Sequence, residues 1–259
     1  MKKIYLCFLT IFLVLFGCSS KQINTLDTVL KRGKLIVGYT EFPPMGYMEN
    51  GNVIGFDIDL AKEVSKKLGV EVEFKYIDWN SKFFELESGR IDCIWNGLTI
   101  TEDRLKEMEF SKKYLDNNLV ILTLKSSNIE TSADLNGKII GVESTSSGQI
   151  ALVNNKKIYA SIKKMNEYDT SNSALLALKS GAIDAMIVDE IYARYYVLNK
   201  SDEFKIGKEI IGTEEYGIGF TKGNTTLKDK IDEILDELVA SGVAQEISQK
   251  WFNTNLISR

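Results

Sequence analysis

Two charged residues of opposite sign follow apolar segments that are predicted to be buried strands. Arg104 comes a few residues after segment 91–95, and Asp189 directly follows segment 183–188. A guanidinium offers a planar fork that suits a carboxylate, and an aspartate suits an ammonium group. If both residues face one cleft, the pair matches the two charges of an amino-acid backbone. The structural alternatives are that Arg104 pairs with a helix carboxylate such as Glu107, and that Asp189 caps the helix that follows it.

The composition excludes several other kinds of chemistry. The chain of 259 residues contains no histidine, which removes Ser-His-Asp and Cys-His catalysis and the commonest ligand of zinc and copper. Its formal net charge of −4 offers no basic surface for nucleic acid. We therefore expect no metal, no cofactor and no nucleic-acid partner.

The N-terminal residues have the pattern of a bacterial lipoprotein signal. Two lysines precede the apolar run 4–16, which is short for a membrane span, and Leu-Phe-Gly then leads to Cys18. We expect a cleaved signal peptide over residues 1–17, a lipid on Cys18 and a tether over residues 18–29. The alternatives are an ordinary signal peptide or a short membrane anchor. Cys93 then remains as a core thiol, so no disulfide framework is expected.

Strand and helix patterns alternate along the rest of the chain. Apolar or alternating segments predict strands, and apolar residues at helical spacing predict helices, the first with Asp57 as N-cap and Gly69 at its end. The alternation predicts an α/β fold with mostly parallel sheets covered by helices. The predicted strands are 35–39, 70–77, 91–95, 119–124, 138–142, 183–188 and 216–221, and the predicted helices are 55–69, 80–89, 171–181, 189–198 and 225–242.

Two segments share one local pattern. SGRIDCIWNG (88–97) and SGAIDAMIVDE (180–190) both run from a glycine through Ile-Asp into a buried strand, which is consistent with two α/β lobes of like construction. In open α/β sheets, ligands bind beyond the carboxyl ends of the strands. This rule selects residues 96–104 in one lobe and Asp189 in the other.

Five segments carry a resemblance to a known family: GFDIDLAKEVSKKLGVEVEF, ESGRIDCIWNGLTITEDRLKEMEFSKKYL, DLNGKIIGVESTSSGQ, ALKSGAIDAMIVDE and YGIGFTKG. In order and spacing they resemble the polar amino-acid-binding proteins of bacterial ABC importers, which have a periplasmic-binding-protein-like type II fold. The resemblance covers nearly all of residues 30–255. It implies two lobes, each a mixed, mostly parallel sheet flanked by helices. The implied boundaries are 30–115 with 216–259 for lobe 1, 118–212 for lobe 2, and hinge crossings near 114–118 and 212–216.

The resemblance also implies roles for individual residues. The turn Gly97-Leu98-Thr99 followed by Arg104 resembles the α-carboxylate site of the family, and Asp189 resembles the residue that takes the α-ammonium group. Thr145 stands where the family often has glycine. The other implied ligand-site residues are Asn96 at the same strand end, the aromatic pair Phe42 and Trp79, the second-lobe loop residues Ser146 and Ser147, and the acids Glu41 and Glu143.

The expected function is that of a receptor subunit. A monomeric, lipid-anchored, extracytoplasmic protein would capture a polar amino acid between its lobes and deliver it to an ABC permease in the membrane. Glu41 and Glu143 favour a cationic ligand over an acidic one, because a second acid near an acidic ligand repels it. A neutral polar ligand that hydrogen-bonds the same carboxylates is the alternative. The rival function on the same fold is that of a cyclohexadienyl dehydratase-like enzyme. A sensory module or an ion-channel ligand domain is a third possibility.

Overall fold

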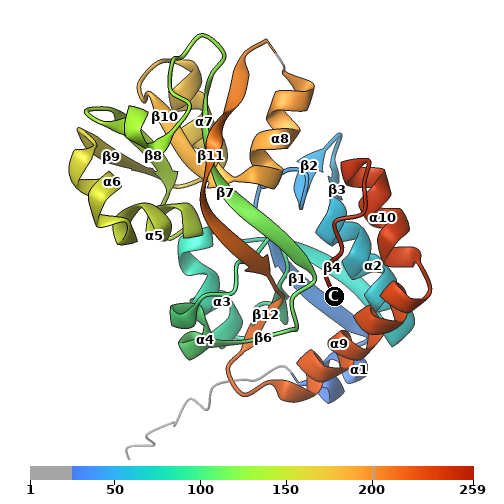
Figure 1. Ribbon diagram of the computed structural model, residues 1–259. Helices are drawn as coiled ribbons and strands as arrows, with labels where there is room; N and C mark the ends of the chain where they lie inside the picture. Colours follow the sequence, from blue (N-terminus) through green and yellow to red (C-terminus); the bar gives the residue numbers. More distant parts are fainter. Residues whose placement is uncertain (1–24, 201) are drawn as a thin grey trace, which may run out of the picture.

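The protein folds into two lobes, each built around a five-stranded sheet (Figure 1). The computed structural model describes residues 25–200 and 202–259. The expected signal peptide (1–17) and Cys18 lie outside these residues. Within them, no helix is both long and apolar enough to cross a membrane.

The first lobe contains the N-terminal strands and the C-terminal helices. Its sheet has the order β4-β1-β5-β12-β6. Strand β1 runs parallel to β4 and β5, whereas β12 runs antiparallel to β5 and β6. Its strands are β1 (Lys34–Tyr39), β4 (Glu71–Tyr76), β5 (Cys93–Ile94), β6 (Met108–Phe110) and β12 (Gly219–Thr221), with a hairpin of β2 (Tyr47–Glu49) and β3 (Asn52–Ile54). Its helices are α1 (Leu26–Arg32), α2 (Phe56–Leu68), η1 (Trp79–Ser81), α3 (Lys82–Glu87), α4 (Glu102–Glu107), α9 (Thr225–Ala240) and α10 (Val243–Phe252).

The second lobe is built from the middle of the chain. Its sheet has the order β11-β7-β10-β8-β9, in which β10, β8 and β9 are parallel and β7 and β11 are antiparallel to their neighbours. Its strands are β7 (Leu115–Leu124), β8 (Ile139–Glu143), β9 (Lys164–Tyr168), β10 (Ala185–Asp189) and β11 (Phe204–Tyr216). Its helices are η2 (Ser132–Leu135), α5 (Ser147–Asn154), α6 (Lys156–Ser161), α7 (Ser171–Lys179) and α8 (Glu190–Asn199).

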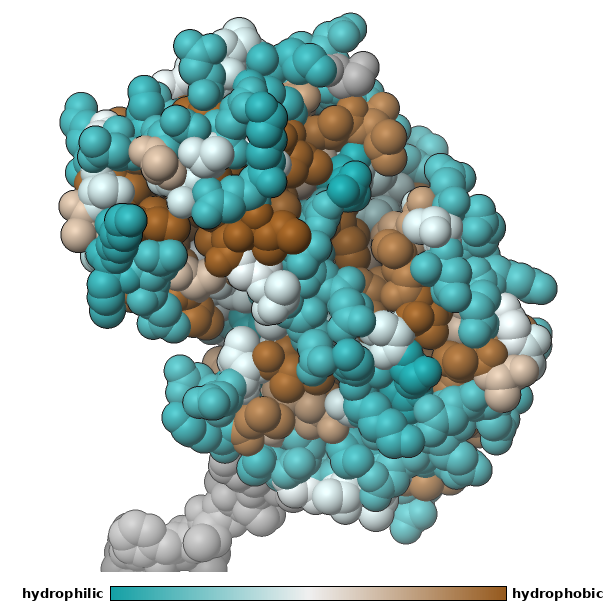
Figure 2. All heavy atoms as spheres, in the orientation of Figure 1, coloured by the Kyte–Doolittle hydropathy of each residue, from teal (hydrophilic) through white to brown (hydrophobic). Residues whose placement is uncertain are grey.

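Two long strands connect the lobes. β7 and β11 pair antiparallel, and their register places Asn118 opposite Thr213 and Leu115 opposite Tyr216. The chain therefore crosses between the lobes as a two-stranded ribbon (Figure 1). Figure 2 shows the outline of the molecule notched beside this ribbon, between α5 of one lobe and α4 of the other.

The structure corrects two details of the sequence-based prediction near the N-terminus. Residues 26–29, which were expected to belong to the tether, form the first part of α1, and Val29 is fully buried. Asp57 is not the N-cap of its helix. Gly55 occupies that position, and Asp57 is buried, where its Oδ2 accepts hydrogen bonds from the Gly97 N–H (2.7 Å) and the Tyr114 hydroxyl (3.0 Å).

The predicted strands differ from the observed ones mainly at their ends. Segment 91–95 forms only the two-residue strand β5, and the chain then bends at Asn96 and Gly97. Segment 216–221 is divided between the end of β11 and the separate strand β12. Cys93 lies in β5 as a buried free thiol.

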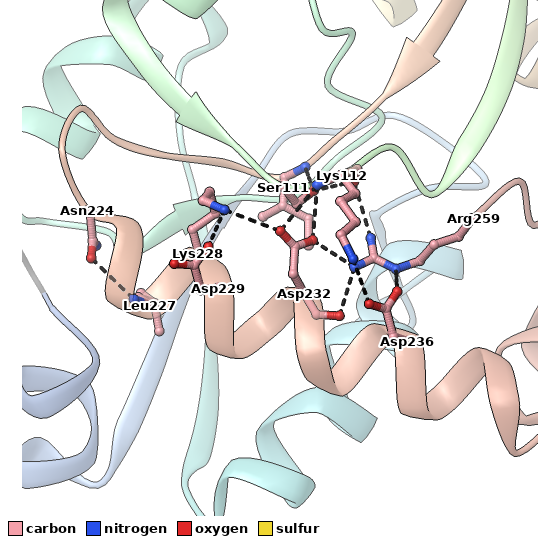
Figure 3. Close-up of polar contacts among 10 residues, drawn as sticks. Ser111, Lys112, Asn224, Leu227, Lys228, Asp229, Asp232, Asp236 and Arg259 are labelled. Carbon is pink, nitrogen blue, oxygen red and sulfur yellow. Dashed lines mark hydrogen bonds and ion pairs between the residues drawn. The ribbon is translucent and has the colours of Figure 1, made fainter.

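The last residues of the chain are fixed beside the start of β7. Ile257 forms a β-bridge with Leu115, and Arg259 reaches α9, where its side chain is 3% exposed. Its guanidinium bonds Asp232 (2.7 Å) and Asp236 (2.6 Å), and the same two acids bind the main chain and the ammonium group of Lys112 (Figure 3). This C-terminal clamp fixes the lobe 1 end of the interlobe ribbon.

Candidate ligand-binding site

A cavity lies between the two lobes. Its walls carry charged, polar and aromatic side chains from both lobes. The sequence-based prediction named every lining residue except Thr40, and it also named Glu41 and Leu98, which do not line the cavity. The lining residues are Thr40, Phe42, Trp79, Asn96, Gly97, Thr99 and Arg104 from lobe 1 and Glu143, Ser146, Ser147 and Asp189 from lobe 2.

Arg104 forms the positive side of the cavity. It comes from the short helix α4, which Thr101 caps, and it is 4% exposed. Its Nη1 donates to the Thr99 carbonyl (2.9 Å), and its Nη2 crosses to lobe 2 and donates to the Thr145 carbonyl (3.1 Å). Burial lowers the pKa of Arg104, and the charges of Glu214 and Asp189 oppose that shift. A guanidinium carries five N–H donors, so this residue retains donors for a carboxylate in the cavity.

The turn that follows β5 is shaped by Gly97 and Asp57. Gly97 has φ +62°, a left-handed conformation that favours glycine, and an added Cβ would lie 3.1 Å from the Phe42 ring. Because the Gly97 N–H donates to Asp57, the buried carboxylate fixes this turn from below. Burial raises the pKa of Asp57 to about 7. The Thr99 hydroxyl donates to Glu214 (3.1 Å) and so faces the hinge, whereas the family resemblance implied a contact with the ligand.

Asp189 forms the negative side of the cavity at the end of β10. It occupies the N-cap position of α8, as the structural alternative expected, but its side chain makes no capping hydrogen bond to the helix. Its Oδ1 accepts from the Asn117 amide (2.8 Å) and from the Tyr216 hydroxyl. Burial, followed by the negative charge of Glu214, raises the pKa of Asp189 well above its usual range. The alternative for Arg104 fails, because its observed partners are main-chain carbonyls.

Glu143 adds a second carboxylate on the lobe 2 side. It ends β8 and accepts a hydrogen bond from the Ser171 hydroxyl (2.5 Å). Burial raises its pKa to about 7, while Lys82 and Arg104 act in the opposite direction. A cation beside Glu143 would favour the ionised carboxylate.

The loop before α5 closes the cavity from lobe 2. Ser146 is the N-cap of this helix and accepts from the Gln149 N–H (3.1 Å), and Ser147 begins the helix. Thr145, before them, has φ +57°, an unfavourable conformation for a β-branched residue. Lys82 holds Thr145 from lobe 1 by donating from Nζ to its Oγ1 (2.9 Å).

Two aromatic residues line the cavity on the lobe 1 side. Phe42 stacks on Tyr192 of lobe 2, with ring centroids 5.2 Å apart. The Trp79 ring lies under both nearby cations, 5.7 Å from the Arg104 guanidinium and 4.8 Å from the Lys82 ammonium. These cation–π contacts hold Trp79 as one wall of the cavity.

Glu41 and Leu98 have structural positions. Both Glu41 carboxylate oxygens accept from the Met48 N–H (3.2 Å), so this side chain supports the β2–β3 hairpin. Leu98 is fully buried in the apolar cluster beneath the sheet of lobe 1. Neither position gives a side chain that faces a ligand.

Sequence reasoning missed Lys82, Asn117 and Glu214 around the site. Lys82 is 2% exposed, and burial lowers its pKa to about 7. Asn117 and Glu214 lie on the two crossing strands, in polar segments without a strand pattern. No group of three or more His, Cys, Asp or Glu is placed to hold a metal ion in residues 25–200 and 202–259.

Residues 35–254 match the family model of the bacterial extracellular solute-binding proteins, family 3. The chain belongs to this family. Members of this family are extracytoplasmic solute-binding proteins. The fold is the two-lobe periplasmic-binding-protein fold. The expectation drawn from the five sequence segments is therefore confirmed at the level of family and fold.

Similar solute-binding proteins carry the names of different amino acids. The arginine-binding extracellular protein ArtP of Bacillus subtilis is 32% identical over 223 residues, covering 85% of this chain and 86% of that protein. The L-cystine-binding protein TcyJ of Escherichia coli K12 is 30% identical over 235 residues, covering 89% and 87%. A substrate-binding protein of an ABC uptake transporter from Streptococcus pneumoniae, solved with bound histidine, is 36% identical with a TM-score of 0.88, covering 93% of this chain and all of that one.

Proposed function

We propose that this solute-binding protein captures a free α-amino acid between its lobes and delivers it to an ABC importer. The observation that carries the proposal is the placement of Arg104 and Asp189, which meet in one cavity from different lobes. Arg104 would hold the α-carboxylate and Asp189 the α-ammonium group. A ligand that contacts both lobes binds the closed state more strongly than the open one, which is the condition for ligand-driven closure.

We further propose that the ligand is a cationic amino acid such as arginine, lysine or ornithine. After the two backbone charges are paired, Glu143 remains as an unmatched acid in the cavity wall, next to the aromatic faces of Phe42 and Trp79. These groups suit a cationic side chain. Lys82 does not line the cavity and already donates to Trp79 and Thr145, so it offers little to an acidic side chain.

A thermal-shift panel of the common amino acids tests both proposals. A saturating cationic amino acid should raise the melting temperature by roughly several degrees through mass action. Stabilisation by glutamate or aspartate, with none from lysine or arginine, would contradict the cationic ligand. No stabilisation by any amino acid would contradict the receptor function.

The variant Glu143→Gln is the matched control for ligand charge. It keeps the side-chain shape but removes the charge, so affinity for lysine or arginine should fall relative to glutamine. In the wild type, affinity for these cations should rise as the pH rises toward 7, because the bound cation favours ionised Glu143. The rise should be smaller in the variant. An equal pH dependence in both proteins would assign the ligand's cation to another partner.

We also propose that the protein acts as a lipid-anchored monomer whose anchor is Cys18. The tether would span residues 18–25, because α1 begins at Leu26. With α1 included, lobe 1 would comprise residues 26–115 with 216–259, and lobe 2 residues 118–212. Cys18→Ser should prevent incorporation of labelled fatty acid, and equal labelling of the variant would contradict this anchor.

Assays with prephenate and arogenate should give no dehydration, and turnover of either would favour the dehydratase-like alternative.

A further inference from the structure

A network of side-chain hydrogen bonds runs through the interlobe ribbon. It connects the turn before Arg104, on the positive side of the cavity, to Asp189 on the negative side. The Thr99 hydroxyl donates to Glu214 Oε1 (3.1 Å) on β11, and Glu214 Oε2 accepts from the Asn117 amide (2.7 Å) on β7. The same amide nitrogen donates to Asp189 Oδ1 (2.8 Å) in lobe 2. The Tyr216 hydroxyl completes the set from the end of β11 by donating to Asp189. We call these residues, Thr99, Glu214, Asn117, Asp189 and Tyr216, the hinge network.

The hinge network brings two buried carboxyl groups to one amide nitrogen. Asp189 and Glu214 are each 7% exposed. Two carboxylates that accept from one amide nitrogen, both removed from water, repel each other strongly when both are ionised. A proton on Asp189 removes this repulsion.

The surroundings of the pair contain one strong positive charge. Arg104 faces it from α4, and Tyr216 and Asn117 face it from the ribbon. Glu143 lies on β8 near Arg104 and competes for that charge. Glu215 and Lys113 pair with each other at the surface, on the other face of the ribbon (2.8 Å). The cavity therefore holds more buried acids than buried bases until a ligand arrives.

Resting on the proposed amino-acid ligand, we propose that Glu214 is a positioning residue of the site, and that Asp189 beside it holds a proton which the ligand's α-ammonium group displaces on binding. The ammonium group keeps its own protons and replaces the proton of Asp189 as the positive partner of the two acids. The displaced proton leaves to the buffer, so up to one proton is released for each ligand bound. Asn117 and Tyr216 hold Asp189 in place throughout. The Thr99 hydroxyl links Glu214 to the turn before Arg104, the residue that would bind the ligand's α-carboxylate.

The raised pKa of Asp189 agrees with this arrangement and has the charge of Glu214 among its causes. An acid with a raised pKa in the folded state holds a proton that the unfolded chain has lost. Its contribution to stability is therefore largest at acidic pH and falls as the pH rises toward the folded-state pKa. This sign gives a test that needs no ligand.

The first experiment follows the stability of the ligand-free protein against pH. Glu214→Gln should flatten the fall in stability between acidic and neutral pH, because the neutral amide removes the charge of Glu214, while burial still raises the pKa of Asp189. Glu215→Gln, one residue further along β11 and exposed, should retain the wild-type profile. Identical profiles for wild type and Glu214→Gln would overturn the proposed effect of Glu214 on the proton of Asp189, whatever the ligand proves to be.

The second experiment counts protons by calorimetry, with L-arginine as the probe, in neutral buffers of different ionisation enthalpy. The wild type should release more protons per arginine than Glu214→Gln, and Asp189→Asn should show the same loss or a larger one. Any release caused by Glu143 is present in both wild type and Glu214→Gln and cancels in the difference. Equal proton counts in these two proteins would overturn the inference. If arginine fails to bind, the proposed cationic ligand is contradicted. The ligand-free stability profiles still test whether Asp189 holds a proton beside Glu214.

Discussion

The two lobes meet on a hinge side and on a cleft side, and the two contacts differ in chemistry. On the hinge side, Asp189 of β10 and Glu214 of β11 both accept from the side-chain amide of Asn117 on β7. The connecting strands keep these groups together. On the cleft side, the Arg104 and Lys82 side chains of lobe 1 donate hydrogen bonds to Thr145 of lobe 2. No connecting strand holds these groups together.

The difference suggests a division of labour between the two sides. Separation of the lobes must break the contacts to Thr145, whereas Asn117, Glu214 and Tyr216 of the hinge network lie on the strands that connect the lobes. Substitutions on the hinge side should therefore change proton release and recognition of the ammonium group. Substitutions on the cleft side should change the balance between open and closed forms.

Arg104→Met should have the largest effect, because Arg104 belongs to both the ligand site and the cleft-side contact. The variant loses a buried guanidinium and its charge-assisted bonds, worth roughly 3 kcal/mol or more, which is about 100-fold in affinity. Calorimetry measures the loss, and circular dichroism checks that the fold remains. Arg104→Lys should also bind poorly, since an ammonium group lacks the planar fork. Near-normal affinity in Arg104→Met would remove Arg104 from the site.

Asp189→Asn should be the next largest effect and is specific to the hinge side. The amide keeps the size of the side chain but loses the charge that would meet the α-ammonium group. Affinity for α-amino acids should fall by about 10-fold or more, and affinity for the matching desamino acids should fall much less. An equal loss for both compounds would make Asp189 a purely structural residue.

Lys82→Met should have a smaller effect, confined to the cleft side. The variant loses the hydrogen bond to Thr145 but keeps an apolar stem against Trp79. We expect the ligand-free protein to open, with a larger radius of gyration in small-angle scattering, and the affinity to fall by up to about 10-fold. The radius with saturating ligand should match the wild type. An unchanged ligand-free radius would separate Lys82 from closure.

Thr145→Gly should have the smallest effect, because two changes oppose each other. Glycine adopts φ +57° without the strain of a β-branched residue, a gain of about 1 kcal/mol. The same change removes the hydroxyl that Lys82 binds, a loss of about 1 kcal/mol. The melting temperature should therefore shift by only a few degrees, and the Arg104 bond to the carbonyl should survive. A shift of ten degrees or more would mean that one term dominates.

The sequence predicted the residues that line the cavity better than the residues that hold the lining in place. Arg104 and Asp189 could be found because parallel strands direct their carboxyl ends to one edge, and the family resemblance supplied most of the remaining lining. Lys82 could not be found, because a lysine in a short amphipathic helix is usually solvated. Its burial follows from the approach of Thr145, which is distant in the sequence.

The ribbon escaped prediction for a related reason. Residues 204–216 carry glycines and several charges, which are unusual in a strand, and tertiary pairing with β7 overrides that local preference. Asp57 was misassigned because an aspartate near a helix start normally caps it. The actual start at Phe56 turns its carboxylate inward, toward Gly97 and Tyr114.

The buried thiol in the first sheet has a practical consequence for spectroscopy. Cys93 is the free cysteine of the described residues, fully buried, and burial raises its pKa well above the usual range. Dyes that couple to thiols react with the exposed thiolate form, so Cys93 stays unlabelled in the folded protein. A cysteine introduced at Leu198, which lies in α8 and is 77% exposed, would then carry a fluorophore on lobe 2 without removal of the native thiol. When Cys18 carries its proposed lipid or is replaced by serine, a single surface substitution in the mature chain thus turns the protein into an optical reporter of lobe movement.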